Sequence, residues 1–367
     1  MTSMKSDTGV LVSSARVLQD SPERPEDERP SGVCVWGHRV SVLILFRRER
    51  VTGEALPKII QVVGPTASGK TNFSVRLAEA LGGELINVDS MQVYRPLAVG
   101  TDKPTAAQCA RVPIHGIDLI DFGPPMDASE FAEYARAKIS EIHARGRCCV
   151  ISGGTGLYHR AIVHGLIAAP ARNDDVRAAL RAERDQIGIA AMYARLQAVD
   201  PVAAGRIYAQ DWVRIERALE VYMTTGTRLS ESQDAHGFRT AYVSRLAFGC
   251  TAERPVLYAK IERRLEEMWQ GGIIEETQAM LDAGLEPEQL PLKALGYRQA
   301  AMFLRGECTS AEALELAKRE TRRFAKRQLT WFRADPEVEW LEMPLSDEAF
   351  EQVSERCRAF LADVCEA

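Results

Sequence analysis

The sequence predicts an α/β fold, in which a parallel sheet core is joined to a helical insertion domain and a helical C-terminal region. Three short apolar runs rich in β-branched residues are each followed by Gly, Asp or Ser, as is typical of buried parallel strands. Helical candidates near 71–81 and 128–145 lie between them, and this alternation indicates helices that cover both faces of a sheet. The three apolar runs are residues 59–63, 85–88 and 148–151.

Length and composition agree with a globular protein of two or three domains, since the chain has 367 residues, of which 46% are hydrophobic and 26% charged. From about Asp174 to Thr224 the strand signals give way to Ala-, Arg- and Glu-rich amphipathic segments. A charged, proline-broken stretch at 21–30 cannot form a packed core. We therefore expect a disordered extension at 1–57, a core from 58–170 and 250–333, a mostly helical insertion at 171–249 and a C-terminal tail segment at 334–367.

The formal net charge of −5 provides no overall positive field, so a nucleic-acid partner would need a local basic patch. No two of the eight cysteines stand in C-x-x-C spacing, and we expect free thiols in a reducing cytosol. The longest apolar run near the N-terminus, residues 40–46, is far shorter than the roughly 20 residues of a transmembrane helix. We therefore expect a cytoplasmic protein with no membrane partner.

Residues 64–71 match the pattern G-x-x-x-x-G-K-[ST] at every defined position. The motif follows an apolar strand and opens a helix, which is the context that a phosphate-binding P-loop requires. Backbone N–H groups and the helix N-terminus would face phosphate oxygens, while Lys70 adds a positive charge and Thr71 can hold Mg²⁺. This predicts a P-loop NTPase-like core, although the motif does not say whether the phosphates belong to ATP. The diphosphate cradle would consist of Gly64, Pro65, Thr66, Ala67, Ser68, Gly69, Lys70 and Thr71.

Two further segments follow the second and third apolar runs. Ligands of open α/β sheets lie outside the carboxyl ends of the strands, so Asp89 should face the P-loop. This carboxylate could hold Mg²⁺ through its hydration shell, accept a proton from a nucleophile, or cap a helix. A Gly-Gly-Thr turn within 152–158 allows close backbone approach to a ligand, and Thr155 could cap the next helix or bind phosphate. A simple strand-to-helix turn is the alternative.

Taken together, these motifs resemble the tRNA isopentenyltransferase family, which comprises the tRNA dimethylallyltransferases. The similarity extends in the family's order from about 58 to 333 and includes residues 100–104, 211–220, 296–298 and 325–332. It is a resemblance to the bacterial form, because no Cys/His finger follows Trp331. The resemblance implies transfer of a dimethylallyl group from dimethylallyl diphosphate, with Mg²⁺, to N6 of the adenosine 3′-adjacent to the anticodon of tRNA, and we expect a monomer.

The resemblance also implies roles for individual residues. The P-loop would hold the diphosphate leaving group, which Lys70 and Mg²⁺ would neutralise, and Asp89 would take the proton from the adenine amine. Thr155 and Arg264 match family positions near the reacting groups, with Arg264 on the diphosphate oxygens; without the resemblance, Arg264 would be an exposed arginine on a helix face. The residues that correspond to tRNA contacts are Asp89, Ser90, Met91, Gln92, Arg177, Val213, Arg214, Ile215, Glu216, Arg217, Lys293, Ala294, Leu295, Gly296, Tyr297 and Arg298.

A basic run supplies the local patch that the overall charge lacks. Residues 318–333 contain seven basic side chains and one acidic side chain. Such a run can bind RNA phosphates or can form a solvated helix face. The helical insertion and this run favour tRNA as the substrate.

Three alternatives remain open. A P-loop small-molecule kinase would need an arginine-bearing lid over the γ-phosphate and would leave residues 296–298 and 325–331 without a role. An adenylate isopentenyltransferase would perform the same chemistry on a free nucleotide, without need of the insertion. A non-catalytic RNA-binding protein would carry a degenerate P-loop, whereas Gly69, Lys70 and Thr71 are intact.

Overall fold

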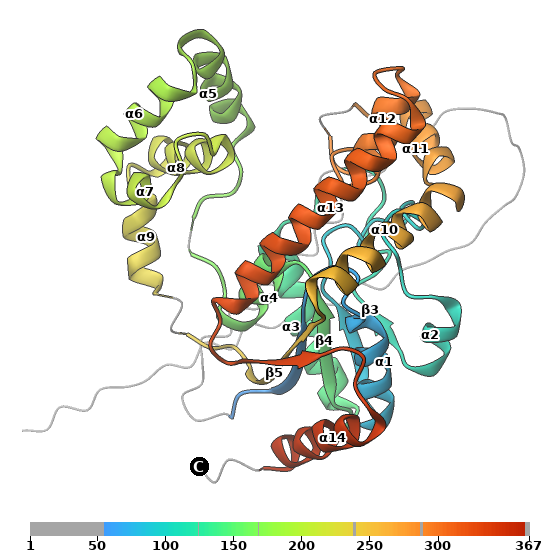
Figure 1. The fold of residues 1–367 in the computed structure, drawn as a ribbon. Helices are drawn as coiled ribbons and strands as arrows, with labels where there is room; N and C mark the ends of the chain where they lie inside the picture. Colours follow the sequence, from blue (N-terminus) through green and yellow to red (C-terminus); the bar gives the residue numbers. More distant parts are fainter. Residues whose placement is uncertain (1–54, 124, 168, 238–239, 287–288, 364–367) are drawn as a thin grey trace, which may run out of the picture. The chain divides into compact units, whose positions relative to one another are not determined.

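A computed structural model describes residues 55–363, apart from 124, 168, 238–239 and 287–288 (Figure 1). The extension expected at 1–57 therefore lies almost entirely outside the described residues. The described chain forms a six-stranded sheet of order β3-β2-β4-β1-β5-β6, and its neighbouring strands pair in parallel. The predicted α/β class is confirmed.

Three of the six strands are the predicted apolar runs, namely β1, β2 and β4. The other three lie outside the predicted runs. Strand β5 has four consecutive buried positions, whereas β3 has only two residues and β6 has one buried position. An edge strand with one buried residue lacks both the continuous apolar run and the alternation that predict a strand. The strands are β1 (Lys58–Val63), β2 (Glu84–Asn87), β3 (Ile114–His115), β4 (Cys149–Gly153), β5 (Ser244–Thr251) and β6 (Val338–Glu342).

Helices cover both faces of the sheet. Successive side chains of a strand point to opposite faces, so Ile59 packs in one buried cluster with α3 (Ala128–Ala144) and α4 (Gly156–His164). Ile60 packs in another with α1 (Lys70–Ala80) and α14 (Asp347–Ala362). Helix α3 begins at a capping box formed by Asp127 and Glu130, which satisfies N–H groups that have no partner within the helix.

The segment between α4 and β5 forms a helical unit with its own core. Its helices contact one another, and Leu180, Leu196, Ile215 and Leu219 are fully buried among them. Periodic apolar residues on an amphipathic helix produce this kind of packing. The helices are α5 (Asp174–Ile187), α6 (Ile189–Val199), α7 (Pro201–Arg206), α8 (Trp212–Thr225) and α9 (Leu229–His236).

The C-terminal helices begin after β5. Leu257, Ile261 and Leu265 of α10 pack against Ala317 and Ala325 of α13, so the small residues of one helix receive the large residues of the other. A short helix, α2, lies earlier in the chain, before β3. These helices are α2 (Ala106–Arg111), α10 (Arg254–Gln270), α11 (Ile273–Asp282), α12 (Tyr297–Leu304) and α13 (Ser310–Arg333).

Residues 334–367, which we expected as a tail, contribute to the sheet domain. They supply the edge strand β6 and helix α14, whose Phe350 and Val353 are buried in the core cluster that contains α1. The aromatic rings of Phe350 and Phe73 meet edge to face, with centroids 6.1 Å apart. The core therefore extends to the C-terminal helix.

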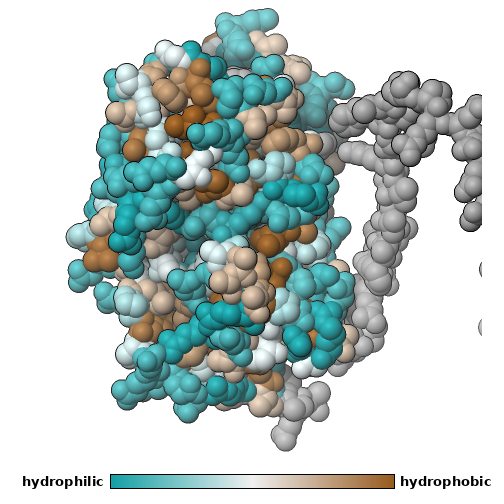
Figure 2. Space-filling model, turned by 90° about the vertical axis from the view of Figure 1, so that its right-hand side faces the viewer, coloured by the Kyte–Doolittle hydropathy of each residue, from teal (hydrophilic) through white to brown (hydrophobic). Residues whose placement is uncertain are grey.

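The surface drawn in Figure 2 is largely hydrophilic, and its hydrophobic residues lie in small separate groups. Within the part of the chain that the structure describes, no helix combines the length and the apolar character needed to cross a membrane. The six described cysteines are free thiols.

Candidate active site

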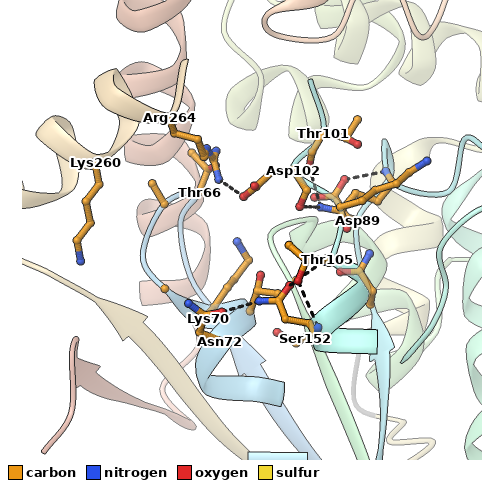
Figure 3. A pocket seen from close by; sticks show the side chains of 18 of the residues that line it. Thr66, Lys70, Asn72, Asp89, Thr101, Asp102, Thr105, Ser152, Lys260 and Arg264 are labelled. Atoms are coloured by element: carbon orange, nitrogen blue, oxygen red, sulfur yellow. Dashed lines mark hydrogen bonds and ion pairs between the residues drawn. The ribbon is translucent and has the colours of Figure 1, made fainter. Parts of the chain in front are cut away.

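The loops that follow β1, β2 and β4 line one cavity at the carboxyl ends of the strands. The cavity has a volume of about 690 Å³, and Figure 3 shows Lys70, Asp89 and Arg264 around it. Parallel strands place these loops at the same edge of the sheet. The predicted P-loop, Asp89 and Arg264 are thus brought together, although 194 positions separate Lys70 from Arg264 in the sequence.

The P-loop has the backbone conformation of a phosphate cradle. Gly64 has φ of 153°, and a Cβ there would lie 2.4 Å from the backbone oxygen of Cys250, so this position requires glycine. Gly69 adopts the left-handed region with φ of 88° and precedes α1 without a side-chain cap. The first N–H groups of α1 therefore remain available to an anion.

Lys70 and Arg264 concentrate positive charge at this cradle. The Lys70 ammonium donates to the backbone oxygen of Pro65 at 3.4 Å. Burial lowers its pKa, and the nearby Arg264 guanidinium lowers it further, while Asp89 acts in the opposite direction. An anion bound between the two cations would stabilise both in their charged forms. The electrostatics thus favour a ligand with several negative charges.

Arg264 is anchored over the P-loop. Its guanidinium donates to Asp102 Oδ2 at 2.7 Å and also to Thr66 Oγ1. The side chain is 23% exposed, so Arg264 is not the solvated arginine that an isolated amphipathic helix predicts. Its Nε is buried without a partner among the described residues. Arg264 thus lies beside Thr66 of the P-loop, and its role on the diphosphate oxygens stays a prediction from the resemblance.

Asp89 does not cap a helix, which was one of its three possible roles, because residues 90–93 form a turn. Its Oδ1 accepts hydrogen bonds from the backbone N–H groups of Met91 at 2.8 Å and Gln92 at 3.3 Å, as an aspartate does in an Asx turn. No described group donates a hydrogen bond to Oδ2. Because Asp89 also lines the cavity, one carboxylate oxygen fixes the local backbone while the other can serve chemistry. Of its neighbours, Gln92 is buried, whereas Ser90 and Met91 are half-buried.

Thr155 joins two loops of the site. Its Oγ1 accepts a hydrogen bond from the backbone N–H of Ser90 at 3.0 Å, and it makes no side-chain cap to α4. Thr155 is not one of the described residues that line the cavity. The turn before it is tight, because a Cβ on Gly153 would lie 2.0 Å from the backbone oxygen of Val88. In this arrangement Thr155 positions the segment that carries Asp89.

Gln328 is a residue of the site that the sequence did not reveal. Its Oε1 accepts from the backbone N–H of Thr66 at 2.9 Å, and its Nε2 donates to the backbone oxygen of Gly154 at 2.9 Å. Helix α13 thereby bridges the P-loop and the turn after β4. Gln328 lies within the 325–332 motif, which contributes to the resemblance, and nothing in the sequence predicts which polar side chain of that helix faces the loops.

The predicted tRNA contacts in the helical unit fall into two groups. Val213 is 73% exposed and Arg214 is also exposed, whereas Ile215 and Glu216 are buried. Arg177 donates two hydrogen bonds, each of 2.9 Å, to the buried carboxylate of Glu220. The structure therefore presents Val213 and Arg214 outward and holds Arg177 in an internal ion pair.

Glu220 is the centre of that ion-pair network. Arg217 also bonds to it, at 2.7 Å. Burial alone would raise the pKa of Glu220, but the hydrogen bonds from Arg177 and Arg217 outweigh burial and lower it to about 2. Breaking such a buried pair leaves an uncompensated charge, so Arg177 and Arg217 stabilise the helical unit itself.

The tRNA contacts predicted at 293–298 are likewise divided into exposed and buried residues. Lys293 and Arg298 are exposed, and Ala294 and Leu295 are half-buried. Gly296 is buried, and Tyr297 has no exposed surface.

The basic run on α13 is partly neutralised. Lys318 is buried and paired with Glu266 and Glu315, and ion pairs also engage Arg319, Arg322 and Arg323. Within the described part of the chain, the exposed Lys326 and Arg327 form no ion pair. The basic surface available to a phosphate backbone is therefore smaller than the sequence count predicts.

A sequence model of a family described as IPP transferase matches residues 92–335. The chain belongs to the IPP transferase family. This finding confirms the resemblance that the motifs indicated. Among related IPP transferases, tRNA dimethylallyltransferase 1 of Pelobacter propionicus is 45% identical over 310 residues, which are 84% of this chain and 99% of that protein. The tRNA dimethylallyltransferase of Geobacter sulfurreducens is 43% identical over 81% of this chain and 96% of its own length.

Solved structures agree with the family assignment. The full-length tRNA isopentenylpyrophosphate transferase of Bacillus halodurans is 37% identical, with a TM-score of 0.63 over 83% of this chain and 97% of its own. A tRNA delta(2)-isopentenylpyrophosphate transferase of Staphylococcus epidermidis is 31% identical, with a TM-score of 0.60 over 83% of this chain and 99% of its own. These likenesses place the present IPP transferase among prenyl-transferring enzymes with this fold.

Proposed function

We propose that this IPP transferase is a tRNA dimethylallyltransferase, which transfers the dimethylallyl group of dimethylallyl diphosphate to N6 of the adenosine 3′-adjacent to the anticodon. The observation that carries the proposal is that two cations, Lys70 and Arg264, line the same cavity as Asp89. They lie at the P-loop, where the N-terminus of α1 has no side-chain cap. The two cations suit a departing diphosphate. The carboxylate suits an amine that must lose a proton. Relatives named tRNA dimethylallyltransferase support the same activity.

The chemical step forms one bond and breaks another. The N6 atom of adenine attacks the allylic carbon, the bond from that carbon to the diphosphate oxygen breaks, and the electron pair leaves with the diphosphate. Lys70, Arg264 and the N–H groups of the P-loop stabilise the charge on the leaving group. Asp89 accepts the proton that N6 releases. Because the adenine amine is a weak nucleophile, its placement against the allylic carbon contributes strongly to the rate.

Magnesium fits this site as an ion held jointly with the substrate. The described residues contain no group of three or more His, Cys, Asp or Glu side chains that could hold a metal by themselves. Mg²⁺ commonly keeps several water ligands and binds through substrate phosphates, and Thr71 lines the cavity. When bound, the ion would neutralise charge on the diphosphate, with Thr71 as its ligand from the protein.

We infer that tRNA approaches across the exposed basic and apolar side chains of the helical regions. Lys326 and Arg327 on α13, and Arg214 on α8, are exposed cations that can bind phosphates. The exposed Val213 lies next to Arg214 and can contact a base or sugar. We place this reaction in the cytoplasm and assign it to a monomer.

The test is an incubation of the purified protein with Mg²⁺, labelled dimethylallyl diphosphate and either unmodified tRNA or free AMP. Label in tRNA alone supports the proposal. Label in AMP would instead identify an adenylate isopentenyltransferase. Absence of label in both, together with ATP-dependent phosphorylation of a small molecule, would identify a kinase. Omission of Mg²⁺ should abolish the transfer if Thr71 and the diphosphate hold the ion.

A further inference from the structure

The proposed chemistry leaves the motif at 100–104 without a role. We define the 98–102 loop as Ala98, Val99, Gly100, Thr101 and Asp102. The loop lies between the cavity, which Thr101 and Asp102 line, and the C-terminal helices α11 and α12. Its contacts on the two sides are of different kinds.

On the side of the C-terminal helices, one carboxylate collects the N–H groups of the loop. Glu276 Oε1 accepts from the backbone N–H of Ala98 at 2.6 Å and of Val99 at 3.3 Å. Glu276 Oε2 accepts from the backbone N–H of Gly100 at 3.3 Å and from the hydroxyl of Tyr297 at 2.5 Å. Hydrogen bonds to an ionised acceptor are the strong ones, so Glu276 holds three consecutive residues of the loop.

Tyr297 also holds the loop, through its hydroxyl and through the packing of its ring against Gly100. The hydroxyl of Tyr297 accepts from the backbone N–H of Gly100 at 3.0 Å while it donates to Glu276. The side chain is fully buried. A Cβ on Gly100 would lie 2.5 Å from the ring carbon Cζ of Tyr297, so the loop backbone rests directly against the ring. Burial, together with the bond to Glu276, raises the pKa of Tyr297, and the hydroxyl keeps its proton at neutral pH.

On the cavity side, the same loop holds two parts of the site. The backbone oxygens of Thr101 and Asp102 accept from Gln92 Nε2 at 2.8 Å and 3.2 Å, and Gln92 is one of the two residues whose N–H binds Asp89. The carboxylate of Asp102 pairs with Arg264 at 2.7 Å. Asp102 has φ of 56°, in the left-handed region that aspartate adopts more readily than most residues other than glycine.

We propose that Tyr297 and Glu276 are positioning residues of the reaction, which act through the 98–102 loop on Arg264 and on the segment of Asp89. This inference rests on the proposed function, because it concerns the same site. It also changes the role of Tyr297 from the tRNA contact that the resemblance implies, since a fully buried ring has no surface to offer a macromolecule. The tRNA-contacting part of the 293–298 motif is then its exposed pair, Lys293 and Arg298.

The test compares Tyr297→Phe with Tyr134→Phe. Tyr134 is a matched control, because its hydroxyl also accepts a backbone N–H from a glycine, Gly116, at 3.2 Å, and it lies on α3 outside the cavity lining. Four quantities are measured for each variant: the melting temperature, the dissociation constant for tRNA, the single-turnover transfer rate with both substrates saturating, and the binding of inorganic pyrophosphate with Mg²⁺.

For Tyr297→Phe we expect the single-turnover rate to fall by about 10- to 100-fold, since small displacements of reacting groups have effects of this size. Pyrophosphate should bind at least about fivefold more weakly, which is the low end of the coupling between linked sites. The dissociation constant for tRNA should stay within about twofold of the wild-type value, a change smaller than the low end of the coupling between linked sites. Tyr134→Phe should leave the transfer rate, the pyrophosphate affinity and the tRNA affinity unchanged, even if its melting temperature falls as much as that of Tyr297→Phe.

Two outcomes would overturn the proposal. Weaker tRNA binding with an unchanged saturating rate would make Tyr297 a tRNA contact after all. An unchanged rate and unchanged pyrophosphate binding at a lowered melting temperature would make it a structural residue only. If Tyr297→Phe does not fold, Glu276→Gln is measured in the same way, with the same expectations. Pyrophosphate binding needs no transfer, so it tests the loop even if the wild-type protein fails to modify tRNA.

Discussion

Replacing Gln328 with alanine should damage both the stability and the substrate affinity of this enzyme. The side chain is buried and makes two hydrogen bonds of 2.9 Å, one to the P-loop at Thr66 and one to the turn at Gly154. Leaving a buried donor or acceptor unpaired costs about 1–3 kcal/mol. With two such groups, and with water able to enter the space and satisfy part of them, we expect the free energy of unfolding to fall by about 2–4 kcal/mol.

The functional effect should appear in the Michaelis constant for dimethylallyl diphosphate. Without Gln328 the P-loop loses its hydrogen bond to α13, so the cradle must be ordered by the substrate itself, and a binding cost of about 1.4 kcal/mol would raise that constant tenfold. Urea denaturation and steady-state kinetics measure the two effects. Gln278→Ala is the matched control, because this glutamine of α11 is exposed and bonds only to Asp282 among the described residues.

The control should change the free energy of unfolding by less than about 0.5 kcal/mol. The reasoning fails if Gln328→Ala is as stable as the control and binds dimethylallyl diphosphate equally well. A loss of stability with unchanged kinetics would show that the bridge supports the fold without shaping the cradle.

Three further predictions concern other parts of the molecule. Asp89→Ala should abolish label transfer while filter binding of tRNA is retained; turnover at the wild-type rate would exclude Asp89 as the base. The double variant Lys326→Glu with Arg327→Glu should weaken tRNA binding and reduce its salt dependence by about two phosphate contacts, which a titration with KCl measures; an unchanged slope would return these residues to a solvated face. Because the pKa of Glu220 is lowered from 4.5 to about 2, its ion pairs stabilise the fold above pH 4.5 and are lost as the pH falls toward 2. Glu220→Gln should therefore be less stable than the wild type at pH 7, by a difference that shrinks in acid denaturation curves, and a difference independent of pH would contradict this.

The parts of the fold that the sequence predicts are those encoded locally. The strand, turn and helix around residues 64–71 are adjacent in the chain, and the apolar run, the glycines and the lysine each follow from local backbone chemistry. The same is true of Asp89, which lies two residues after the end of β2. Strand β6 was missed for the opposite reason, since it is fixed by pairing with β5 and has one buried residue.

Within the site, the sequence predicts which residues carry charge but not how they are held. Arg264 was assigned through the resemblance, while its partner Asp102 appears only when the loop after Tyr94 and helix α10 are placed together. The sequence also does not show that the side chain of Tyr297 is buried, since burial is a property of the folded chain. The resemblance therefore implies a tRNA contact at Tyr297. Four of the seven basic residues in 318–333 pair with carboxylates, two of them with residues of α13 itself and two with residues of α10. Helical periodicity alone does not show the pairing with α10.

The bridge made by Gln328 has a consequence for the order of synthesis. The P-loop receives this hydrogen bond from a residue 262 positions later in the chain, and ribosomes add roughly 5–20 residues per second. The loop therefore leaves the ribosome tens of seconds before its partner, at about those rates. During that interval the nascent chain carries the phosphate-binding motif without the helix that anchors it. A chain that ends before α13 therefore lacks the hydrogen bond that joins the P-loop to this helix, and the site is complete only when the last helices have been made.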